Sequence, residues 1–570
     1  MGMKLMMINM HIIVCLMLLA IRLASASTFT ITSIADSGPG TLRDALARAA
    51  DGDTINATWI HGTIRLTSGE LFVGKSVIIA GPGPARLAVD ANRLSRLFHI
   101  GPGMVVSLAG IGIYNGGGIY NDHATLTVRN CIVIGNFGGG GAGLRNDGHL
   151  GTATLNVVNS LIMSNSCPNE SSNGGGILND GSDGNANVTL VNSIVRDNST
   201  GFLGGGIFND GTDGNATVTM ISSIVNGNNA GGFGGGIYNA GWFGTGLVTM
   251  ENSIVNENQA GKGGGVFNAG YGGSASLNIT NCSIIGNKCF SYGGGLCNSM
   301  SGGNALMNLV NSTISKNSAA FAGGVFSGHD YFVPIVGPGN ASLQILNCTF
   351  SDNLAEAIYL ANGAGTGTVE IGSTIINASA LGSTISSNSV ATSLGYNLSS
   401  DDGGGVLTNS TDLINTDPQL GPLRDNGGLT LTHALLPGSP ALDQGKNFSG
   451  LPFDQRGHSF TRTFDNRCIP NSPDGDGTDI GAFEVHTASP VQGVQYLLTL
   501  VNSQVDRPQP LRAILDRVLI SIGWNNTATI SQLTAFQQQV STQVLPSNQP
   551  LAAVLLQAAQ DIISTLDIRR

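Results

Sequence analysis

Apolar and polar residues alternate with a period of two over short stretches, and the whole pattern restarts about every thirty residues. The segment from Gly204 to Asn229, GGGIFNDGTDGNATVTMISSIVNGNN, follows a near copy of itself, GGGILNDGSDGNANVTLVNSIVRDNS. Alternate residues of a strand face opposite sides, so this period predicts strands with one buried side. Each unit has room for three short strands and their bends, but not for a helix.

Three columns of asparagine recur when the units are aligned. The first contains Asn121, Asn146, Asn179, Asn209, Asn239, Asn268 and Asn298. The second contains Asn130, Asn159, Asn192, Ser222, Asn252, Asn281, Asn311 and Asn347, and the third contains Asn136, Asn165, Asn198, Asn228, Asn258, Asn287, Asn317 and Asn353. The apolar pattern slips by one residue at the second column, which predicts a corner where an Asx side chain satisfies turning backbone.

Stacking of such units predicts a parallel β-solenoid with strands ~4.8 Å apart. Stacked asparagines would bond along the ladder while valine and isoleucine fill the interior. Parallel crossovers are nearly always right-handed, so we expect a mainly β protein, a right-handed parallel β-helix with three strands per coil. The leucine spacing of leucine-rich repeats is absent. The Gly triplets fit a tight bend where successive backbones crowd together.

Other patterns flank the repeats. Residues 42–49 have apolar positions at helical spacing and predict a helix that caps the first coil. From Ser489 the period becomes 3.6 residues, with breaks near Pro508, Asn525 and Pro546, which predicts a small bundle of about four helices. The expected organisation is a signal peptide (1–26), an N-terminal cap with the first coils (27–110), regular repeats (111–400), a C-terminal cap (401–486) and a helical bundle (487–570).

Composition and charge narrow the class of protein. Glycine accounts for 83 of 570 residues, and 36 acids outnumber 25 Lys and Arg, which argues against a nucleic-acid partner. Lys4, the apolar run 10–21 and Ala24-Ser25-Ala26 predict a cleaved secretory signal; the alternative, a membrane anchor, is disfavoured by the short run. No membrane span is expected after cleavage. Cys289 and Cys297, which lie close together in the sequence, are the candidate bridge.

Several motifs resemble a known class of exported protein. They are ITSIADSGPGTLRDALARAADGDTI, the GGGIYN and NSxIxxN units, DPQLGPLRDNGGLTLTHALLPGSPALDQG, DQRG (454–457) and DIGAFE (479–484). Together they resemble bacterial secreted right-handed β-helix proteins with a choice-of-anchor Q domain and polymorphic outer-membrane-protein-like repeats. SQLTAFQQQVSTQV and LAAVLLQAAQDII are similar to FIMAH-like helical modules. The resemblance implies an extracellular or surface-displayed protein, with the helical module serving attachment.

Carboxylates form the main candidate site. Asp122, Asp147, Asp180 and Asp210 each follow a first-column asparagine, and Asp183 and Asp213 lie three residues further on. One interpretation is a binding edge that holds calcium at Asp180, Asp183, Asp210 and Asp213, because carboxylate oxygens suit a hard cation. The other is a set of turn residues that point into water. Lys and Arg are scattered between residues 101 and 400, so no basic cluster for an acidic sugar is expected there.

Aromatic and cap residues complete the candidates. Phe208 and Tyr238 belong to a column that forms a strip for sugar rings if it faces outward, or core if it faces inward. In the C-terminal cap, Asp454, Arg456, Asp479 and Glu484 fit an ion-pair network that closes the cap, because the arginine fork can hold two carboxylates.

The sequence favours a non-catalytic, adhesin-like β-helix that binds a surface glycan or protein, with attachment through its helical module. One alternative is a carbohydrate-active lyase or hydrolase that uses the acidic edge. The other is a structural spacer, for which stacked coils alone suffice. No catalytic residue and no cofactor other than calcium is assigned.

Overall fold

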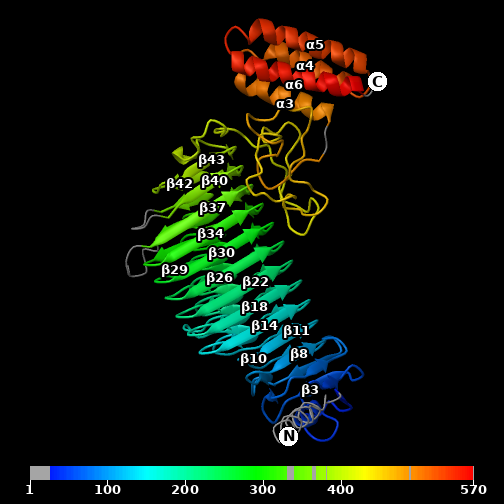
Figure 1. The fold of residues 1–570 in the computed structure, drawn as a ribbon, viewed down its shortest axis with the longest axis vertical. Helices are drawn as coiled ribbons and strands as arrows, with labels where there is room; N and C mark the ends of the chain where they lie inside the picture. Colours follow the sequence, from blue (N-terminus) through cyan, green and yellow to red (C-terminus); the bar gives the residue numbers. More distant parts are fainter. Residues whose placement is uncertain (1–25, 330–338, 362–366, 381, 487–488, 569–570) are drawn as a thin grey trace, which may run out of the picture.

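The computed structural model describes residues 26–329, 339–361, 367–380, 382–486 and 489–568, so nearly all of the expected signal peptide lies outside it. The described chain winds into the expected right-handed parallel β-helix, of about twelve turns, with the N-terminal coils at one end and the helical bundle at the other (Figure 1). We name its three long sheets A, B and C.

Every paired strand of these sheets runs parallel to its neighbour and belongs to an adjacent coil. Sheet A contains β1 (Thr28–Thr30), β2 (Thr54–Asn56), β5 (Ile78–Ala80), β8 (Val105–Ala109), β11 (Thr125–Arg129), β14 (Thr152–Val158), β18 (Asn185–Val191), β22 (Asn215–Ile221), β26 (Thr245–Glu251), β30 (Ser274–Thr280), β34 (Asn304–Val310), β37 (Asn340–Leu346), β40 (Val369–Gly372) and β43 (Thr392–Gly395). Sheet B contains β3 (Gly62–Arg65), β6 (Leu87–Asp90), β9 (Gly112–Tyr114), β12 (Ile132–Ile134), β15 (Leu161–Met163), β19 (Ile194–Arg196), β23 (Ile224–Asn226), β27 (Ile254–Asn256), β31 (Ser283–Ile285), β35 (Thr313–Ser315), β38 (Thr349–Asn353), β41 (Ile375–Ala378) and β44 (Leu398–Ser399).

Sheet C contains β4 (Leu71–Val73), β7 (Phe98–Ile100), β10 (Ile119–Asp122), β13 (Leu144–Asp147), β17 (Ile177–Asp180), β21 (Ile207–Asp210), β25 (Ile237–Ala240), β29 (Val266–Tyr271), β33 (Leu296–Ser301), β36 (Val325–His329), β39 (Ile358–Leu360) and β42 (Ile385–Ser387). The middle coils also have a fourth, two-residue strand, which the sequence pattern did not reveal because two residues are too few to show alternation. These strands are β16 (Ser166–Cys167), β20 (Ser199–Thr200), β24 (Asn229–Ala230), β28 (Gln259–Ala260) and β32 (Lys288–Cys289).

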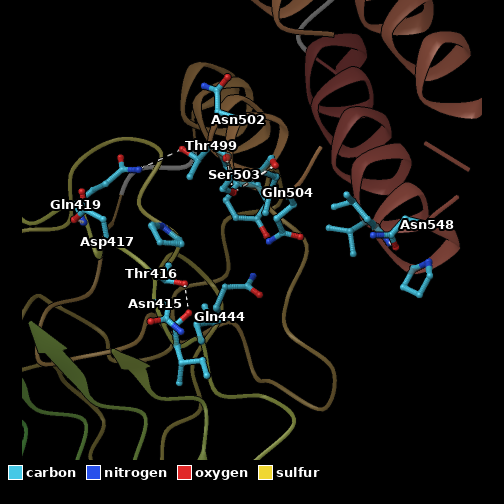
Figure 2. Close-up of a pocket in the computed structure, with 18 residues that line it drawn as sticks. Asn415, Thr416, Asp417, Gln419, Gln444, Thr499, Asn502, Ser503, Gln504 and Asn548 are labelled. Atoms are coloured by element: carbon cyan, nitrogen blue, oxygen red, sulfur yellow. Dashed lines mark hydrogen bonds between the residues drawn. The ribbon is translucent and has the colours of Figure 1, made fainter. Parts of the chain in front are cut away.

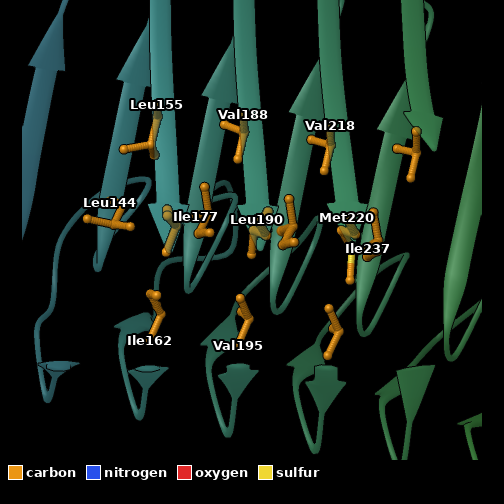
Figure 3. Close-up of a cluster of buried hydrophobic side chains, with 14 of the residues drawn as sticks. Leu144, Leu155, Ile162, Ile177, Val188, Leu190, Val195, Val218, Met220 and Ile237 are labelled. Carbon is orange, nitrogen blue, oxygen red and sulfur yellow. The ribbon is translucent and has the colours of Figure 1, made fainter. Parts of the chain in front are cut away.

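The interior is a continuous stack of aliphatic side chains. Each coil contributes residues from all three sheets, as Leu190 of sheet A, Val195 of sheet B and Ile177 of sheet C do in one coil, and the same positions align in the next (Figure 3). These side chains are almost completely buried. Burying such a side chain stabilises the fold by about 1.5–3 kcal/mol, so the repeating apolar pattern supplies the main driving force.

Two of the asparagine columns form buried ladders. In the first, Asn209 Nδ2 donates to Asn239 Oδ1 (2.7 Å) and to the carbonyl oxygen of Ala216 (3.0 Å). In the third, the backbone nitrogen and Nδ2 of Asn198 both donate to Asn228 Oδ1 (3.0 Å each). The amides of both columns therefore bond to the neighbouring coils, as the sequence predicts, and those of the first column also bond within their own coil.

The second column turns the chain in a different way from the one expected. Its residues have positive φ angles, for example 49° at Asn192, 50° at Ser222 and 51° at Asn252. Asparagine tolerates this left-handed conformation better than most residues. The corner thus selects asparagine for its backbone conformation, and at several corners the side chain bonds elsewhere, as when Asn311 Nδ2 donates to the carbonyl oxygen of Phe453 (2.7 Å).

The glycine triplets have the predicted role at the bend before sheet C. Gly204 has a φ of 64°, in the left-handed region. A Cβ atom at Gly205 or Gly206 would lie 2.5–2.6 Å from a carbonyl oxygen of the next coil. Side chains are therefore excluded where consecutive bends stack on each other.

Helices close the two ends. At the N-terminal end, α2 (Leu42–Arg48) is capped by Thr41 and buries Leu42 and Ala45 against the first coils, as expected. At the other end a short 3₁₀ turn, η1 (Gly403–Gly405), precedes the turn-rich cap. The predicted bundle follows as α3 (Pro490–Gln504), α4 (Gln509–Ser521), α5 (Asn526–Gln543) and α6 (Gln549–Ile568). None of the helices in the described ranges is long and apolar enough to cross a membrane.

The C-terminal cap folds back on the β-helix and also supports the bundle. Thr313 Oγ1 on sheet B donates to Gln455 Oε1 of the cap (2.6 Å). A single hydrophobic cluster runs from Ile375 and Leu398 of the last coils through Ile480 of the cap to Leu497 of α3. The last coils, the cap and the bundle therefore share one hydrophobic core.

The expected bridge between Cys289 and Cys297 is not formed, because neither cysteine takes part in a disulfide. Cys289 lies in β32, whereas Cys297 lies in β33 and is buried beside the aromatic residues of sheet C. The two residues are close in sequence, but the bend between their strands puts them in different sheets.

The ladders predict a large effect of Asn209→Ala. This change removes the buried hydrogen bonds to Asn179, to Asn239 and to the carbonyl oxygen of Ala216, which should destabilise the fold by about 2–4 kcal/mol. Asn215→Ala, an exposed asparagine in the same coil, should cost less than about 0.5 kcal/mol. Urea unfolding followed by circular dichroism checks this, and equal effects of the two substitutions would contradict it.

Candidate functional site

The predicted carboxylates form a row at the strand ends of sheet C. The strand register aligns Asp122, Asp147, Asp180 and Asp210 in consecutive coils. Ile207 and Asn209 point into the β-helix, so by alternation Asp210 points outward. Alanine takes this position in the next two coils, and the row ends there.

At the N-terminal end of this row the carboxylates meet histidines. His99 Nδ1 lies 3.1 Å from Glu70 Oε1, and its Nε2 lies 3.2 Å from Asp122 Oδ2. His123 Nδ1 lies 2.5 Å from Asp122 Oδ1, and its Nε2 lies 2.7 Å from the carbonyl oxygen of His149. An ionised carboxylate and a carbonyl only accept hydrogen bonds, so both ring nitrogens of His123 donate and the ring is an imidazolium.

The pKa shifts agree with this assignment. The hydrogen bonds to Asp122 and to the carbonyl oxygen of His149 raise the pKa of His123. Burial raises the pKa of Asp122, but the hydrogen bonds from His123 and His99 outweigh burial and hold that pKa below its usual value. Both shifts therefore favour the charged forms of Asp122 and His123.

The next two coils extend the network with arginine and tyrosine. Tyr120 Oη donates to Asp147 Oδ2 (2.8 Å). Arg145 Nη2 lies 2.9 Å from Asp147 Oδ2 and donates to Asp180 Oδ2 (3.1 Å). The guanidinium of Arg96 lies over the ring of Tyr120, 4.4 Å from its centroid. The two histidines, the tyrosine hydroxyl and Arg145 are thus already bonded to carboxylates, so these groups form a paired network.

Sequence reasoning missed Glu70, Arg96, His99 and His123 in this network. The alternation in Phe98-His99-Ile100, where the outer two residues are buried, would have placed His99 on the outer face of sheet C. The irregular spacing of the first coils hid its alignment with Tyr120.

The calcium hypothesis gains no support from the local geometry. Asp180 Oδ1 accepts from Ser182, and Asp210 Oδ1 accepts from Thr212. Asp183 and Asp213 occupy left-handed turn positions with φ angles of 51°. Among the described residues no group of three or more His, Cys, Asp or Glu is placed to hold a metal ion. These contacts favour the interpretation as turn residues, and calcium remains an untested prediction.

Phe208 and Tyr238 do not form an exposed strip. By alternation they face outward from sheet C, yet both are buried. Their ring centroids lie 5.6 Å apart, and Tyr238 stacks on Phe267 at 5.3 Å. Leu203 and Phe233, from the bends between coils, pack on them and form a second core outside the sheet. The interpretation as a sugar platform is therefore wrong for these two residues.

The cap carboxylates bind backbone more than they bind arginine. Arg456 holds Asp454 through Nε (2.9 Å) and Nη2 (2.6 Å), and it lies between the rings of Phe460 and Phe483. Its second partner is the carbonyl oxygen of Glu484 (2.5 Å), not the carboxylate that the sequence analysis expected.

Asp479 and Glu484 instead accept from main-chain amides. Asp479 Oδ2 accepts from the nitrogen of Val485 (2.7 Å), and Glu484 Oε2 accepts from the nitrogen of Asp479 (3.0 Å). Fully buried Arg462, which the sequence analysis missed, donates to the carbonyl oxygens of Asp479 (2.9 Å) and Gly481 (2.5 Å). The four predicted residues thus join segments of the cap through buried hydrogen bonds.

A cleft of about 860 Å³ lies between the cap and the helical bundle, and we call it the cap–bundle cleft. Its polar lining is mainly amides and hydroxyls from cap segment 415–444, from α3 and from the start of α6 (Figure 2). These residues are Asn415, Thr416, Asp417, Gln419, Gln444, Tyr496, Thr499, Asn502, Ser503, Gln504 and Asn548. Asp417 is the one ionisable side chain among them apart from the Tyr496 phenol.

The cleft combines open polar groups with an apolar lining. Within the described residues no hydrogen bond forms from the side chains of Asn415, Asn502 or Gln504, or from the hydroxyl of Tyr496. Burial raises the pKa of Tyr496, so its phenol keeps its proton. Leu500, Pro440, Pro550, Leu551 and Val554 supply the apolar surface. Sequence reasoning missed this site because its halves are about 80 residues apart and depend on how the bundle docks.

Comparisons with known proteins do not identify the chain. No protein-family model matches the sequence, and no curated protein matches it. The catalytic domain of a GH87 α-1,3-glucanase in complex with nigerose is similar over 64% of this chain and 68% of that one, with 12% identity and a TM-score of 0.36. A mannuronic-acid-specific polysaccharide family 6 lyase from human gut microbiota covers 66% of this chain and 88% of its own, with 10% identity and a TM-score of 0.23.

Neither likeness extends to activity, because both the identities and the TM-scores are low. The resemblance of the cap motifs to a choice-of-anchor Q domain, and of the bundle to FIMAH-like modules, stays an expectation from sequence.

The paired network predicts the titration of His123. Its pKa should lie above the ordinary 6.5, and Asp122→Asn should lower it. Asp183→Asn, which removes an exposed carboxylate near His149, should leave it unchanged. NMR titration of ring-labelled histidine checks this. The His123 contribution to stability is complete below its unfolded pKa and is lost as pH rises through the folded value, so a His123 midpoint at or below 6.5 would contradict the assignment.

The cap predicts a pH-dependent stability. Burial, and next the charge of Asp479, raise the pKa of Asp443 to about 9. A raised carboxyl pKa stabilises the fold below the unfolded value, and this contribution is lost between about pH 4 and 9 as the buried group ionises. Asp443→Asn should therefore raise the thermal unfolding temperature at pH 8 and flatten its pH dependence. Asp506→Asn, on an exposed residue after α3, is the matched control, and no change in slope for Asp443→Asn would contradict the assignment.

Proposed function

We propose that this protein is an exported, non-catalytic β-helix that binds an uncharged glycan in the cap–bundle cleft. The observation that carries the proposal is the set of amide and hydroxyl groups that have no partner within the described residues and line a cavity of about 860 Å³. Binding sites typically combine apolar walls with a few polar groups that fix orientation. A sugar ring offers polar and apolar surface to match, because hydroxyls surround its edge and C–H groups lie on its faces.

The chemistry of the cleft favours binding over catalysis. Hydrolysis of a glycosidic bond generally needs two carboxyl groups about 5–9.5 Å apart. Among the described residues that line the cleft, Asp417 is the sole carboxylate, and its Oδ1 accepts from the nitrogen of Gln419 (2.9 Å). Amides and a neutral phenol instead supply both donors and acceptors, which suit a ligand with many hydroxyl groups.

The carbohydrate-active alternative would have to use the charged row on sheet C. There the functional groups of Tyr120, His123 and Arg145 are bonded to neighbouring groups, which favours a structural role. Export and surface association are supported by the N-terminal signal pattern and by the resemblance of the cap motifs to secreted proteins. Docking of the bundle on the cap places the cleft at the end of the molecule farthest from the N-terminal coils (Figure 1).

Calorimetric titration with cello-, manno-, laminari- and chito-oligosaccharides tests the proposal. Tyr496→Phe should weaken binding of the positive ligand about three- to tenfold, because one neutral hydrogen bond contributes ~0.5–1.5 kcal/mol. Since the Tyr496 hydroxyl has no partner within the described residues, the unfolding temperature should not change. Gln504→Ala should weaken binding further, whereas Gln538→Ala, an exposed glutamine of α5 outside the cleft, should not.

Two outcomes would overturn the proposal. One is the absence of binding to every uncharged oligosaccharide tested, or binding that Tyr496→Phe and Gln504→Ala leave unchanged. The other is release of shorter products from a bound polysaccharide, because a binding module leaves its ligand intact.

A further inference from the structure

We infer a second binding site, for the anionic groups of an acidic polysaccharide, in a groove over the first coils. The groove has a volume of about 300 Å³ and is lined by segments 93–96 and 137–142. It contains Arg93 and Arg96. The early coils that carry these segments and the helical bundle lie at opposite ends of the molecule (Figure 1). This site goes beyond the proposed function and does not depend on it.

The two arginines are held in place by aromatic rings, which leaves their hydrogen-bond donors open. The guanidinium of Arg93 lies 5.5 Å from the centroid of Phe137, and that of Arg96 lies 4.4 Å from the centroid of Tyr120. Stacking engages the face of a guanidinium and leaves its N–H edge free for a carboxylate or sulfate.

Few of the N–H donors of Arg93 and Arg96 are used by other groups of the protein. Arg96 Nη1 lies 3.7 Å from Glu70 Oε2, which makes a loose ion pair between two half-buried side chains. Within the described residues, the Arg93 side chain makes no ion pair or hydrogen bond. By contrast, Arg145 on the same face is committed to Asp147 and Asp180. Arg93 and Arg96 therefore differ from the paired charges of the neighbouring row.

The wall formed by segment 137–142 includes two glycines that present no side chain to a ligand. Gly138 and Gly139 face open space, since a Cβ built on either would meet no atom within 4 Å. Packing does not demand glycine there, in contrast to the triplet at Gly204–Gly206. Phe137 is 39% exposed beside this wall and offers a flat apolar face for a sugar ring.

The distribution of charged residues along the chain favours binding of an anion at the N-terminal end of the β-helix. Residues 27–150 contain nine Lys and Arg against eight Asp and Glu, whereas residues 151–570 contain fourteen against twenty-eight. A polyanion is therefore repelled by most of the molecule and directed towards the first coils. The sequence analysis missed the pair because it sought basic residues between 101 and 400, and both arginines precede that range.

Binding to polygalacturonate and to dextran sulfate, measured by biolayer interferometry at about 50 mM salt, tests the inference. The first polymer presents carboxylates and the second presents sulfates, so the pair distinguishes the two sources of negative charge. Neutral dextran is the negative control. Binding to at least one acidic polymer, which weakens as salt rises, is expected.

Variants that remove positive charge inside or outside the groove locate the site. The double variant Arg93→Gln/Arg96→Gln should weaken binding about tenfold or more, because two charge-assisted contacts are lost. Arg129→Gln, an exposed arginine at the end of β11 outside the groove, removes one charge and should have little effect. Arg93→Lys should restore part of the affinity over Arg93→Gln, since lysine keeps the charge but not the fork.

The inference is overturned if the unmodified protein binds neither acidic polymer, or if Arg129→Gln weakens binding as much as the double variant does. It is also overturned if the double variant binds like the unmodified protein. Tyr496→Phe should leave acidic-polymer binding intact, so failure of the cleft proposal and failure of this one are separable.

Discussion

The structure depends on stacking of one coil on the next in strict register. A single coil cannot satisfy its own buried amides or close its own core, because strands, asparagine ladders and aliphatic stacks all find their partners in adjacent coils. Buried polar groups without partners are costly, so stability is shared between neighbours and accumulates along the solenoid. The ends are the places where this sharing fails. There α2 covers the first coils, and the C-terminal cap with its bundle covers the last coils.

This constraint also determines where ligands can bind. Interior residues are needed for stacking, and on the outer face of sheet C the side chains pair with each other as charges in the first coils and as buried aromatic rings in the middle coils. Open polar groups gather at the two ends, where the regular pattern breaks. The groove beside Arg93 and the cap–bundle cleft both occupy such positions.

Much of the fold is encoded locally and was predictable from sequence. Alternation in Val218, Met220 and Val225 placed the core, and the asparagine columns placed the ladders and corners. The aromatic column was harder to interpret, because alternation shows that Phe208 leaves the sheet face outward but not that Leu203 covers it. Contacts between segments far apart in the sequence could not be predicted, for the same reason. Arg462 inside the cap and Tyr496 in the cleft depend on how irregular turns fold back, and no periodicity reports such contacts.

The uniform register of β18, β22 and β26 has an evolutionary consequence. Each interface between coils in this region is nearly the same as the next, so a whole unit can be duplicated or deleted without creating a new kind of contact. The length of the molecule can then change in steps of ~4.8 Å, one strand spacing at a time. Gain or loss of coils would therefore change the distance between the two ends of the β-helix while leaving the chemistry of each end intact.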